Sequence, residues 1–448
     1  MSVDKTGILQ ALNPSDYFTL AMDEEIRNEN MAGSLCGFAL ELDSCPNIAL
    51  LEARINELKQ RFPIILASLQ QRGNRFYWCQ REKEEPIFFQ TTCPENTDVE
   101  FFIKNQLETL INQQQSREDI APLSFHLITT ETNCVFLLRW LHPLCDAVGA
   151  NLILQYLCTD EVEKRLAFDT PASEPLLPLR LRKFNLWKKI KLFMKAKRYI
   201  QGLDEQKSII HAADKAPEKL RLASYRLSVA QTAKINKIAR KQVGLTGASL
   251  YYIGCFMRAL ERMNPEQEGE AYCVPYAFNL RKQKALTPLL GNHVGALFAQ
   301  APRNLLANRE QLFAHLKQQN MNVIRQQLDY AFLPVMWAAS YLPLKKHGEN
   351  LRLSYKHKTE RSSFWFSHVS LPELAKQSIC DAEITGFLHL CQVSSPPAIA
   401  LLSCEYQQQL TLSYNYVEPL FSREWVERLH ELMVQELLDE VVEPVAFS

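Results

Sequence analysis

The chain of 448 residues is predicted to adopt an α+β fold with two lobes. Three observations favour this class. The chain is too long for one ordinary hydrophobic core. Its strand-like and helix-like segments are mixed without the regular strand–helix–strand alternation of a Rossmann-type sheet. The order of these segments is loosely similar in the two halves of the chain, so we expect two related lobes.

In the first half, the pattern predicts strands at 35–42, 123–129 and 134–141 and helices at 47–62 and 99–113. Helix 47–62 has a suitable N-cap in Asn47 and is ended by Pro63. It is typical of an amphipathic helix, because its apolar residues share one face: Ile48, Leu51, Ile55, Leu58 and Phe62. Residues 13–18 are expected to form a turn followed by aromatic side chains. A further helix is expected from Ala147.

In the second half, Ser228 is expected to cap a helix that runs to about residue 242, and Gly244 to end it. A buried helix over 246–263 and a strand over 272–278 follow. Residues 393–416 are predicted to form a β-hairpin with its tip near 407–409. The last helix is expected after Ser422, because its apolar residues recur at helical spacing: Trp425, Leu429, Leu432, Met433 and Leu437.

These elements suggest an N-terminal lobe over 1–175, a basic linker over 176–216 and a C-terminal lobe over 217–448. Prolines at 171, 175 and 178 mark the start of the linker. Nine lysines and arginines, and no aspartate or glutamate, lie between Pro175 and Leu203.

Composition excludes several classes of protein. Lys+Arg and Asp+Glu both total 50, so the net charge gives no argument for nucleic-acid binding. Twelve cysteines without a CxxC pair favour reduced thiols in a cytoplasmic protein over disulfides or a metal site. The start of the chain lacks the layout of a signal peptide, and no apolar run approaches the eighteen or so residues of a membrane span.

One segment contains residues that are candidates for catalysis. His142 directly follows the predicted strand 134–141, and Asp146 stands four residues later, before the helix that starts at Ala147. A histidine held at the end of a buried strand has the setting of a general base. The alternative is structural: His142 is then a core histidine and Asp146 an N-cap. Residue chemistry alone leaves both open.

Residues 140–149, WLHPLCDAVG, resemble the HHxxxDG motif of the condensation-domain and CoA-dependent acyltransferase superfamily. This superfamily includes chloramphenicol acetyltransferase, peptide condensation domains, polyketide-associated acyltransferases and wax ester synthases. Further segments match in order: 13–18, 278–281, 290–295 and 366–370. Two positions depart from the motif, since Leu141 replaces its first histidine and Ala147 its glycine. The resemblance implies two chloramphenicol-acetyltransferase-like lobes in a V, with a tunnel between them.

The resemblance also implies site residues. His142 would be the general base, and Asp146 would pair with Arg281 to secure the catalytic loop. Ser367 and Asn292 are candidates for oxyanion or substrate contact. Their structural alternatives are a strand serine bonded to backbone and ordinary turn chemistry around Gly291. No metal or permanently bound cofactor is expected, and coenzyme A or a phosphopantetheine thioester would be the co-substrate.

The implied function is acyl transfer from a thioester donor, such as acyl-CoA, to a hydroxyl or amine of a small molecule or lipid. One alternative is a stand-alone condensation enzyme that takes its donor from an acyl carrier protein in natural-product biosynthesis. The other is a catalytically silent protein that binds an acyl carrier or a lipid, which the replacement of glycine by Ala147 keeps open.

The segment 184–198 has three interpretations. Its apolar residues fall on one helical arc, with most lysines off it: Leu186, Trp187, Ile190, Phe193 and Met194. Such a helix can lie in a membrane interface, which would make the protein peripheral to a membrane. It can equally pack on the protein and leave its lysines in solvent. The third interpretation is attraction to coenzyme A phosphates or an acidic carrier protein.

Overall fold

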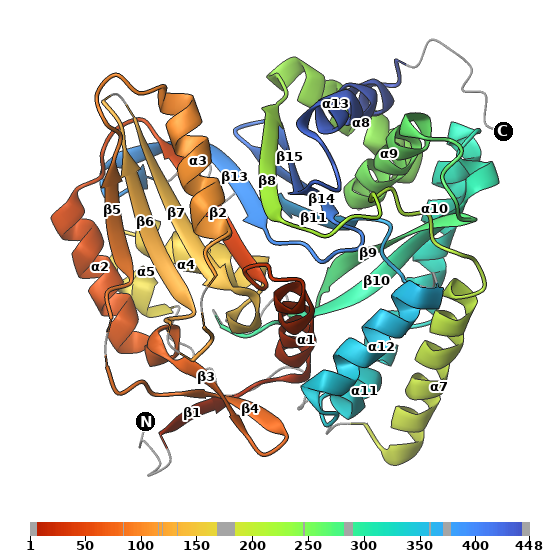
Figure 1. The fold of residues 1–448 in the computed structure, drawn as a ribbon, viewed down its shortest axis with the longest axis horizontal. Coiled ribbons are helices and arrows are strands. Elements are labelled where there is room, and N and C mark those ends of the chain that lie inside the picture. The colour runs from red at the N-terminus through yellow and green to blue at the C-terminus, as the bar shows by residue number, and fades with distance from the viewer. Residues whose placement is uncertain are drawn as a thin grey trace.

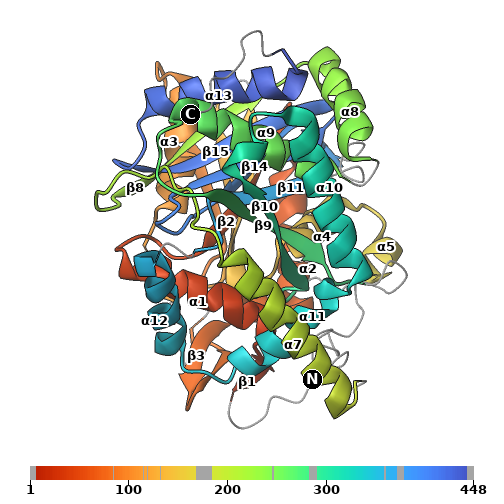
Figure 2. The same cartoon turned by 90° about the vertical axis from the view of Figure 1, so that its right-hand side faces the viewer.

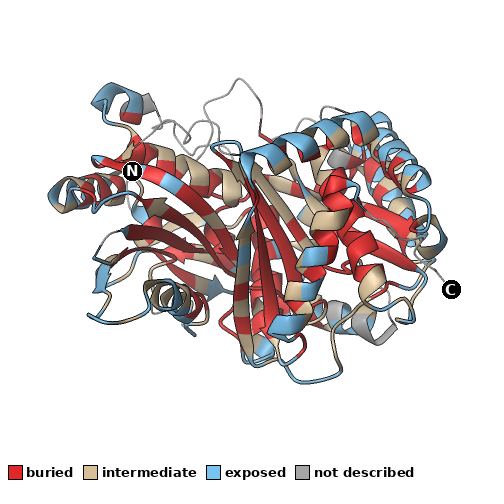
Figure 3. Cartoon of the chain, turned by 90° about the horizontal axis from the view of Figure 1, so that it is seen from above, coloured by how far each residue is buried: buried red, intermediate tan, exposed pale blue. Residues whose placement is uncertain are grey.

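The computed structural model shows two lobes side by side (Figure 1), with the chain running from the first lobe into the second and briefly back. It describes residues 7–83, 85–114, 116–118, 120–131, 133–167, 184–244, 247–281, 290–357, 360–370 and 378–440. The strands of both lobes are largely buried, and the outer helices expose only their outward faces (Figure 3). The predicted two-lobed α+β fold is confirmed.

The first lobe is built on a six-stranded sheet in the order β12-β13-β2-β7-β6-β5. Its strands are β2 (Leu35–Leu42), β5 (Phe88–Thr92), β6 (Leu123–Thr129), β7 (Cys134–Leu141), β12 (Ser378–Ile379) and β13 (Ala382–Cys391). All eight residues of β7 are buried. This strand reads as a nearly continuous apolar run because both faces of the sheet are covered there.

Helices and a small second sheet complete the first lobe. The helices are α1 (Pro14–Asn28), α2 (Ile48–Arg61), α3 (Val99–Ile111), α4 (Ala147–Cys158) and α5 (Val162–Ala167). The small sheet pairs β1 (Ile8–Ala11), β4 (Arg75–Cys79) and β3 (Ser68–Arg72), and the 3-10 helix η1 (Pro63–Leu66) precedes β3. The strands predicted at 35–42, 123–129 and 134–141, the helix start at Ala147 and the Asn47 cap are confirmed.

The expectation of a turn at 13–18 was wrong, because helix α1 begins at Pro14 and runs for 15 residues. Asn13 accepts hydrogen bonds from the amides of Ser15 and Asp16, and the Asp16 carboxylate accepts one from the Asn13 amide. This reciprocal capping box, with proline at the first helical position, is a strong start signal for a helix.

The second lobe has a four-stranded sheet in the order β11-β14-β15-β8. Its strands are β8 (Lys219–Arg226), β11 (Trp365–Ser370), β14 (Ile399–Tyr406) and β15 (Gln409–Glu418). Helices α8 (Val229–Val243), α9 (Ala248–Met263), α10 (Arg309–Arg325) and α13 (Arg423–Leu438) pack around it. The Ser228 cap and the hairpin tip at 407–409 are confirmed.

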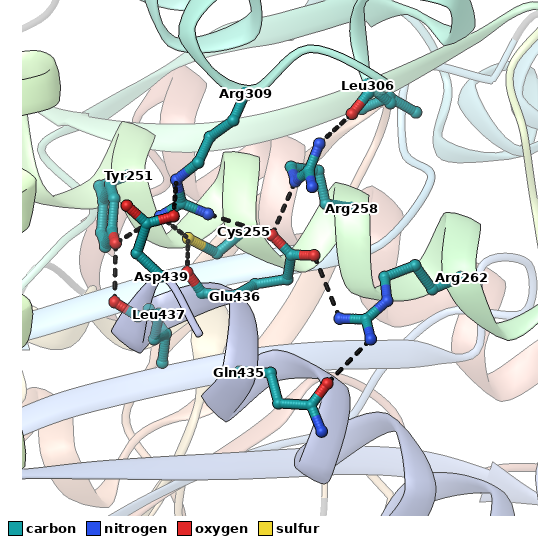
Figure 4. Close-up of polar contacts among 10 residues, drawn as sticks. All are labelled: Tyr251, Cys255, Arg258, Arg262, Leu306, Arg309, Gln435, Glu436, Leu437 and Asp439. Carbon is teal, nitrogen blue, oxygen red and sulfur yellow. Dashed lines mark hydrogen bonds and ion pairs between the residues drawn. The ribbon is translucent and has the colours of Figure 1, made fainter. Parts of the chain in front are cut away.

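Buried charge joins the helices of this lobe. The Glu436 carboxylate on α13 accepts from Arg258 Nε (2.7 Å), Arg262 Nη1 (3.2 Å) and Arg309 Nη1 (3.1 Å) (Figure 4). The first two arginines lie on α9 and the third on α10. Because Glu436 is fully buried, these contacts supply the hydrogen bonds that its carboxylate loses with water.

A hairpin and three helices complete the second half of the chain, and two of these helices, α11 and α12, contact α1 of the first lobe (Figures 1 and 2). The hairpin pairs β9 (Ala271–Asn279) with β10 (Val294–Pro302), and the short helix η3 (Arg303–Leu305) follows it. The helices are α7 (Leu186–Leu203), α11 (Leu328–Ala339) and α12 (Leu344–His357). Across the part of the chain that the structure describes, none of the helices combines the length and apolarity needed to cross a membrane.

The division predicted for the chain needs one correction. Strand β13 pairs with β2, from Ile384 opposite Leu42 to Cys391 opposite Cys36, so part of 217–448 belongs to the first lobe's sheet. The predicted linker contains helix α7. Residues 168–183, with the proline cluster and three of the nine basic residues, lie outside the described ranges. The boundaries at 175 and 216 stay predictions.

Candidate active site

His142 lies where the inner strand β7 ends and the short 3-10 helix η2 (His142–Leu144) begins. Its amide donates a hydrogen bond to the Ser34 carbonyl (2.9 Å), and its carbonyl accepts one from Asn292 Nδ2 (2.8 Å). Ser34 belongs to the first lobe, whereas Asn292 lies just before strand β10. The backbone of His142 is therefore held from both sides of the lobe interface.

The His142 side chain lines a pocket of about 180 Å³ between the lobes. Phe18 and Trp140 contribute to the lining from the first lobe, and Trp365 and Ser367 from strand β11 of the second. The predicted site residues His142 and Ser367 thus line one cavity, whose other walls are largely aromatic or aliphatic. An apolar pocket with a few polar groups is the usual form of a small-molecule site.

Electrostatics favour the neutral form of His142. Burial lowers the pKa of its imidazole, although its own backbone carbonyl and the Asp146 carboxylate act in the opposite direction. A neutral ring can accept a proton at pH 7, as a general base must. Among the described residues, the buried Nδ1 of His142 has no hydrogen-bond partner.

The predicted ion pair between Asp146 and Arg281 is present. Arg281 Nη1 lies 2.7 Å from Asp146 Oδ2, and both side chains are almost fully buried. The same carboxylate accepts from the amides of His293 (2.8 Å) and Gly149 (2.9 Å), the latter as the N-cap of α4. Burial would raise the pKa of Asp146, but Arg281 and these amides hold it below its usual range. Asp146 is therefore both N-cap and ion-pair partner.

Residues 290–294 bring the second half of the chain against the loop that carries His142. The Gly291 amide donates to the Leu144 carbonyl (2.7 Å). Gly291 has a φ of +85°, and a Cβ there would lie 3.3 Å from both Asn13 Nδ2 and His293 Nε2. Glycine is the residue that fits this backbone conformation and this close approach.

Asn292 does not line the pocket, so the expectation that it contacts substrate is not supported by its position. Its fully buried side chain donates to the His142 carbonyl and to Asp16 Oδ1 (3.0 Å). Its amide also donates to Asp16 Oδ1 (2.6 Å), and its carbonyl accepts from Asn13 (3.1 Å). Asn292 therefore positions His142 and ties it to the cap of α1.

Asp16 is the buried carboxyl group that accepts the hydrogen bonds of this arrangement. Its carboxylate receives the two Asn292 donors and the Asn13 amide (2.8 Å). Burial raises the pKa of Asp16 to about 7, while these three donors oppose the rise. The segment at 13–18, which was expected to form a turn and to match the family resemblance, thus helps to hold the loop that carries His142.

His389 was not predicted as a site residue from the sequence. This residue lies on β13 and lines the same pocket as His142. Burial lowers the pKa of His389 to about 3, with a smaller effect from His142. Its Nδ1 atom is buried without a partner among the described residues. No local motif marks His389, because its place depends on the pairing of β13 with β2 across the lobes.

Ala147, which replaces the motif glycine, is the first residue of α4 and lines the pocket. Its methyl group therefore takes space in the cavity beside His142. Leu141, which replaces the first motif histidine, is instead a buried residue of β7. The two departures differ in kind, since only the one at Ala147 changes the shape of the pocket.

No model of a known protein family and no curated protein matches this sequence. Solved structures do match. The trichothecene 15-O-acetyltransferase of Fusarium sporotrichioides is 11% identical, with a TM-score of 0.68 over 96% of this chain and 95% of that one. The condensation domain of the monacolin K polyketide synthase is 11% identical, with a TM-score of 0.66 over 97% and 98%.

The first condensation domain of the calcium-dependent antibiotic synthetase is 12% identical, with a TM-score of 0.65 over 98% of both chains. Each match covers both lobes, so the likeness concerns the whole architecture. At these identities it establishes the fold. The chain therefore has the two-lobed fold of this acetyltransferase and of these condensation domains, which is the fold that the sequence resemblance implied.

Proposed function

We propose that this protein transfers an acyl group from a thioester to a hydroxyl or amine acceptor, with His142 as general base. The observation that carries this proposal is the position of His142, whose neutral ring lines the pocket between the lobes while both sides of the interface hold its backbone. Preorganised placement of a base is what general-base catalysis requires.

In the proposed reaction, His142 removes the proton of the acceptor as its oxygen or nitrogen attacks the thioester carbonyl. A bond forms between acceptor and carbonyl carbon, and the carbonyl oxygen becomes an oxyanion. When the oxyanion collapses, the carbon–sulfur bond breaks and the imidazolium returns the proton to the departing thiolate. Ser367, which shares the pocket with His142, is the candidate donor to the oxyanion.

The donor would be a substrate and not a resident cofactor. The sequence has no glycine loop of the P-loop type that could hold the phosphates of the donor. A coenzyme A or phosphopantetheine arm would therefore be held between the lobes, where it would reach the pocket. The fold likeness to an O-acetyltransferase supports a hydroxyl acceptor, and the likeness to condensation domains supports a donor carried on a protein. Acyl transfer is the reaction common to these two possibilities.

The test is a screen of acyl-CoA thioesters and acyl-loaded carrier proteins against panels of alcohols and amines, read by the intact mass of the products. His142→Ala should lower the rate by about 10²–10⁴-fold. His315→Ala is the matched control, because this histidine lies on α10 and does not line the pocket. Its rate should equal that of the unaltered protein.

The outcomes separate the alternatives. Product from acyl-CoA alone supports a CoA-dependent acyltransferase, and product from the loaded carrier alone supports a stand-alone condensation enzyme. Tight binding of donor without any product would support a silent binding protein, as the methyl group of Ala147 in the pocket would allow. Equal product from the unaltered protein and His142→Ala would reject His142 as the base.

A further inference from the structure

Helix α7 packs on the protein through only one narrow face. Leu192 and Ala196 are buried and belong to a small apolar cluster with Ala331 and Phe332 of α11. The two helices lie side by side at the edge of the molecule (Figures 1 and 2). The residues that anchor α7 are therefore not those of the apolar arc identified in the sequence.

That arc faces outward. Trp187 is 79% exposed and Leu186 69%, and the other three residues of the arc, Ile190, Phe193 and Met194, are also exposed. Residues that recur at three and four positions form one face of a helix. The helix thus packs on the protein with most of its lysines exposed, as one interpretation of 184–198 expected, but it packs by Leu192 and Ala196 and not by this arc.

Positive charge borders the exposed arc. The helix carries six lysines and arginines and no acidic residue. By helical geometry Lys189 lies on one side of the arc, and Lys191 and Arg198 lie on the other. The remaining cations include Lys188, 4.2 Å from the centre of the Phe184 ring, and Lys195, which donates to the Gln326 carbonyl (3.0 Å).

The end of α11 extends this apolar surface. Trp337 and Tyr341 are exposed. They line a groove of about 710 Å³ together with Ile190 and Phe193 of α7. Arg75 of strand β4 lies at the same groove, 4.4 Å from the centre of the Tyr341 ring. An aromatic side chain beside a cation thus occurs just after the end of α11 as well as near α7.

We propose that α7 and residues 337–341 form a docking face for an anionic membrane surface. A ridge of large apolar and aromatic side chains, flanked on both sides by lysine and arginine, matches the apolar interior and negative headgroups of such a surface. A second copy of this chain fits less well, because self-association at α7 would bring six positive charges against six. An acidic carrier protein would pair with the cations, and the test below includes it as an alternative outcome.

The docking face lies one helix away from the candidate active site. Helix α1 contributes Pro14 and Tyr17 to the groove, and Phe18, Thr19 and Met22 to the pocket that contains His142. A membrane at α7 would therefore lie close to the site where an apolar acceptor is consumed. The statement that an acceptor is consumed there rests on the proposed function, whereas the proposal of membrane docking does not.

The test is flotation of the full chain with vesicles of phosphatidylcholine, with and without phosphatidylglycerol. Binding should require the anionic lipid and weaken as salt is added. Trp187→Asp should weaken binding roughly tenfold or more, since it removes one large apolar side chain from the interface. Lys189→Glu combined with Lys191→Glu should weaken binding to anionic vesicles by at least a similar factor.

Matched controls lie elsewhere on the surface. Phe101→Asp alters a side chain on α3 that is 66% exposed, and Lys237→Glu combined with Lys241→Glu reverses two exposed charges on α8. All these proteins should bind as the unaltered chain does. His142→Ala should also bind normally, so failure of acyl transfer and failure of docking are distinguishable.

Several results would overturn the proposal. The first is the absence of vesicle binding, and the second is a loss of binding in the control variants equal to that in Trp187→Asp. A dimer that dissociates on Trp187→Asp, without vesicle binding, would assign the face to a second copy. Retention of an acidic carrier protein by this face, again without vesicle binding, would assign it to a protein partner.

Discussion

Replacing Arg281 by methionine keeps most of the side-chain volume but removes the positive charge that faces Asp146. The Asp146 carboxylate, almost fully buried, then retains only the amides of His293 and Gly149 as donors. Removing one partner of a buried ion pair leaves the other charge buried and unpaired, which lowers the free energy of unfolding by about 3–5 kcal/mol. That is a large fraction of the roughly 5–15 kcal/mol by which most proteins are stable. We expect the free energy of unfolding in urea at pH 7 to fall by this amount.

The loss should depend on pH in a direction that the pKa of Asp146 determines. Arg281 holds that pKa below its usual range, so in the unaltered protein the stabilisation is present above about pH 4 and is lost as the pH falls through the lowered pKa. In Arg281→Met burial prevails and raises the pKa. The carboxyl then stabilises the fold only in its protonated form, and this contribution is lost as the pH rises. The difference between the two proteins should shrink from pH 7 toward pH 4.

Three further variants test the same reasoning. Arg281→Lys should recover much of the stability, because only Nη1 of Arg281 bonds to the carboxylate and a single ammonium can replace it. Asp146→Asn keeps an N-cap for α4 but removes the charge. The double variant Arg281→Met with Asp146→Asn should lose less than the sum of the two single losses. A loss below about 0.5 kcal/mol in Arg281→Met, or a loss independent of pH, would refute the reasoning.

Further expectations follow from the same contacts. If His142 is the base, kcat/KM should fall below a midpoint under about pH 6.5, since burial lowers its pKa, and a midpoint of 7 or above would contradict this. Ala147→Leu should narrow the pocket of about 180 Å³ and raise the KM for the acceptor severalfold, so an unchanged KM would place the acceptor elsewhere. Asn292→Ala should lower the free energy of unfolding in urea by about 1–3 kcal/mol, because the His142 carbonyl and Asp16 each lose a hydrogen-bond donor. An unchanged urea midpoint would show that Asn292 does not stabilise this loop. Glu436→Gln should cost about 3–5 kcal/mol by the same assay, because three arginines lose their shared charge, and a loss under 1 kcal/mol would count against that network.

Much of the local structure around the candidate site was readable in the sequence. The apolar run of β7, the histidine at its end and the cap of α4 at Asp146 are consecutive, and each depends on neighbours within a few residues. The Asp146–Arg281 pair spans 135 positions and was foreseen only through the family resemblance. Helix α1 was not predicted, although its capping box of Asn13 and Asp16 is local, because an asparagine followed by proline is equally typical of a turn.

The sequence by itself thus determined the strand–histidine–helix unit and the fold class, since hydrophobic periodicity and capping are short-range properties. Tertiary structure alone decided that β13 joins the first lobe's sheet and brings His389 into the pocket, because backbone pairing between distant strands leaves no mark on either segment. It also decided which face of α7 meets solvent. An amphipathic pattern shows that a helix has two faces, whereas only the position of α11 shows that Leu192 and Ala196 are covered and Trp187 is not.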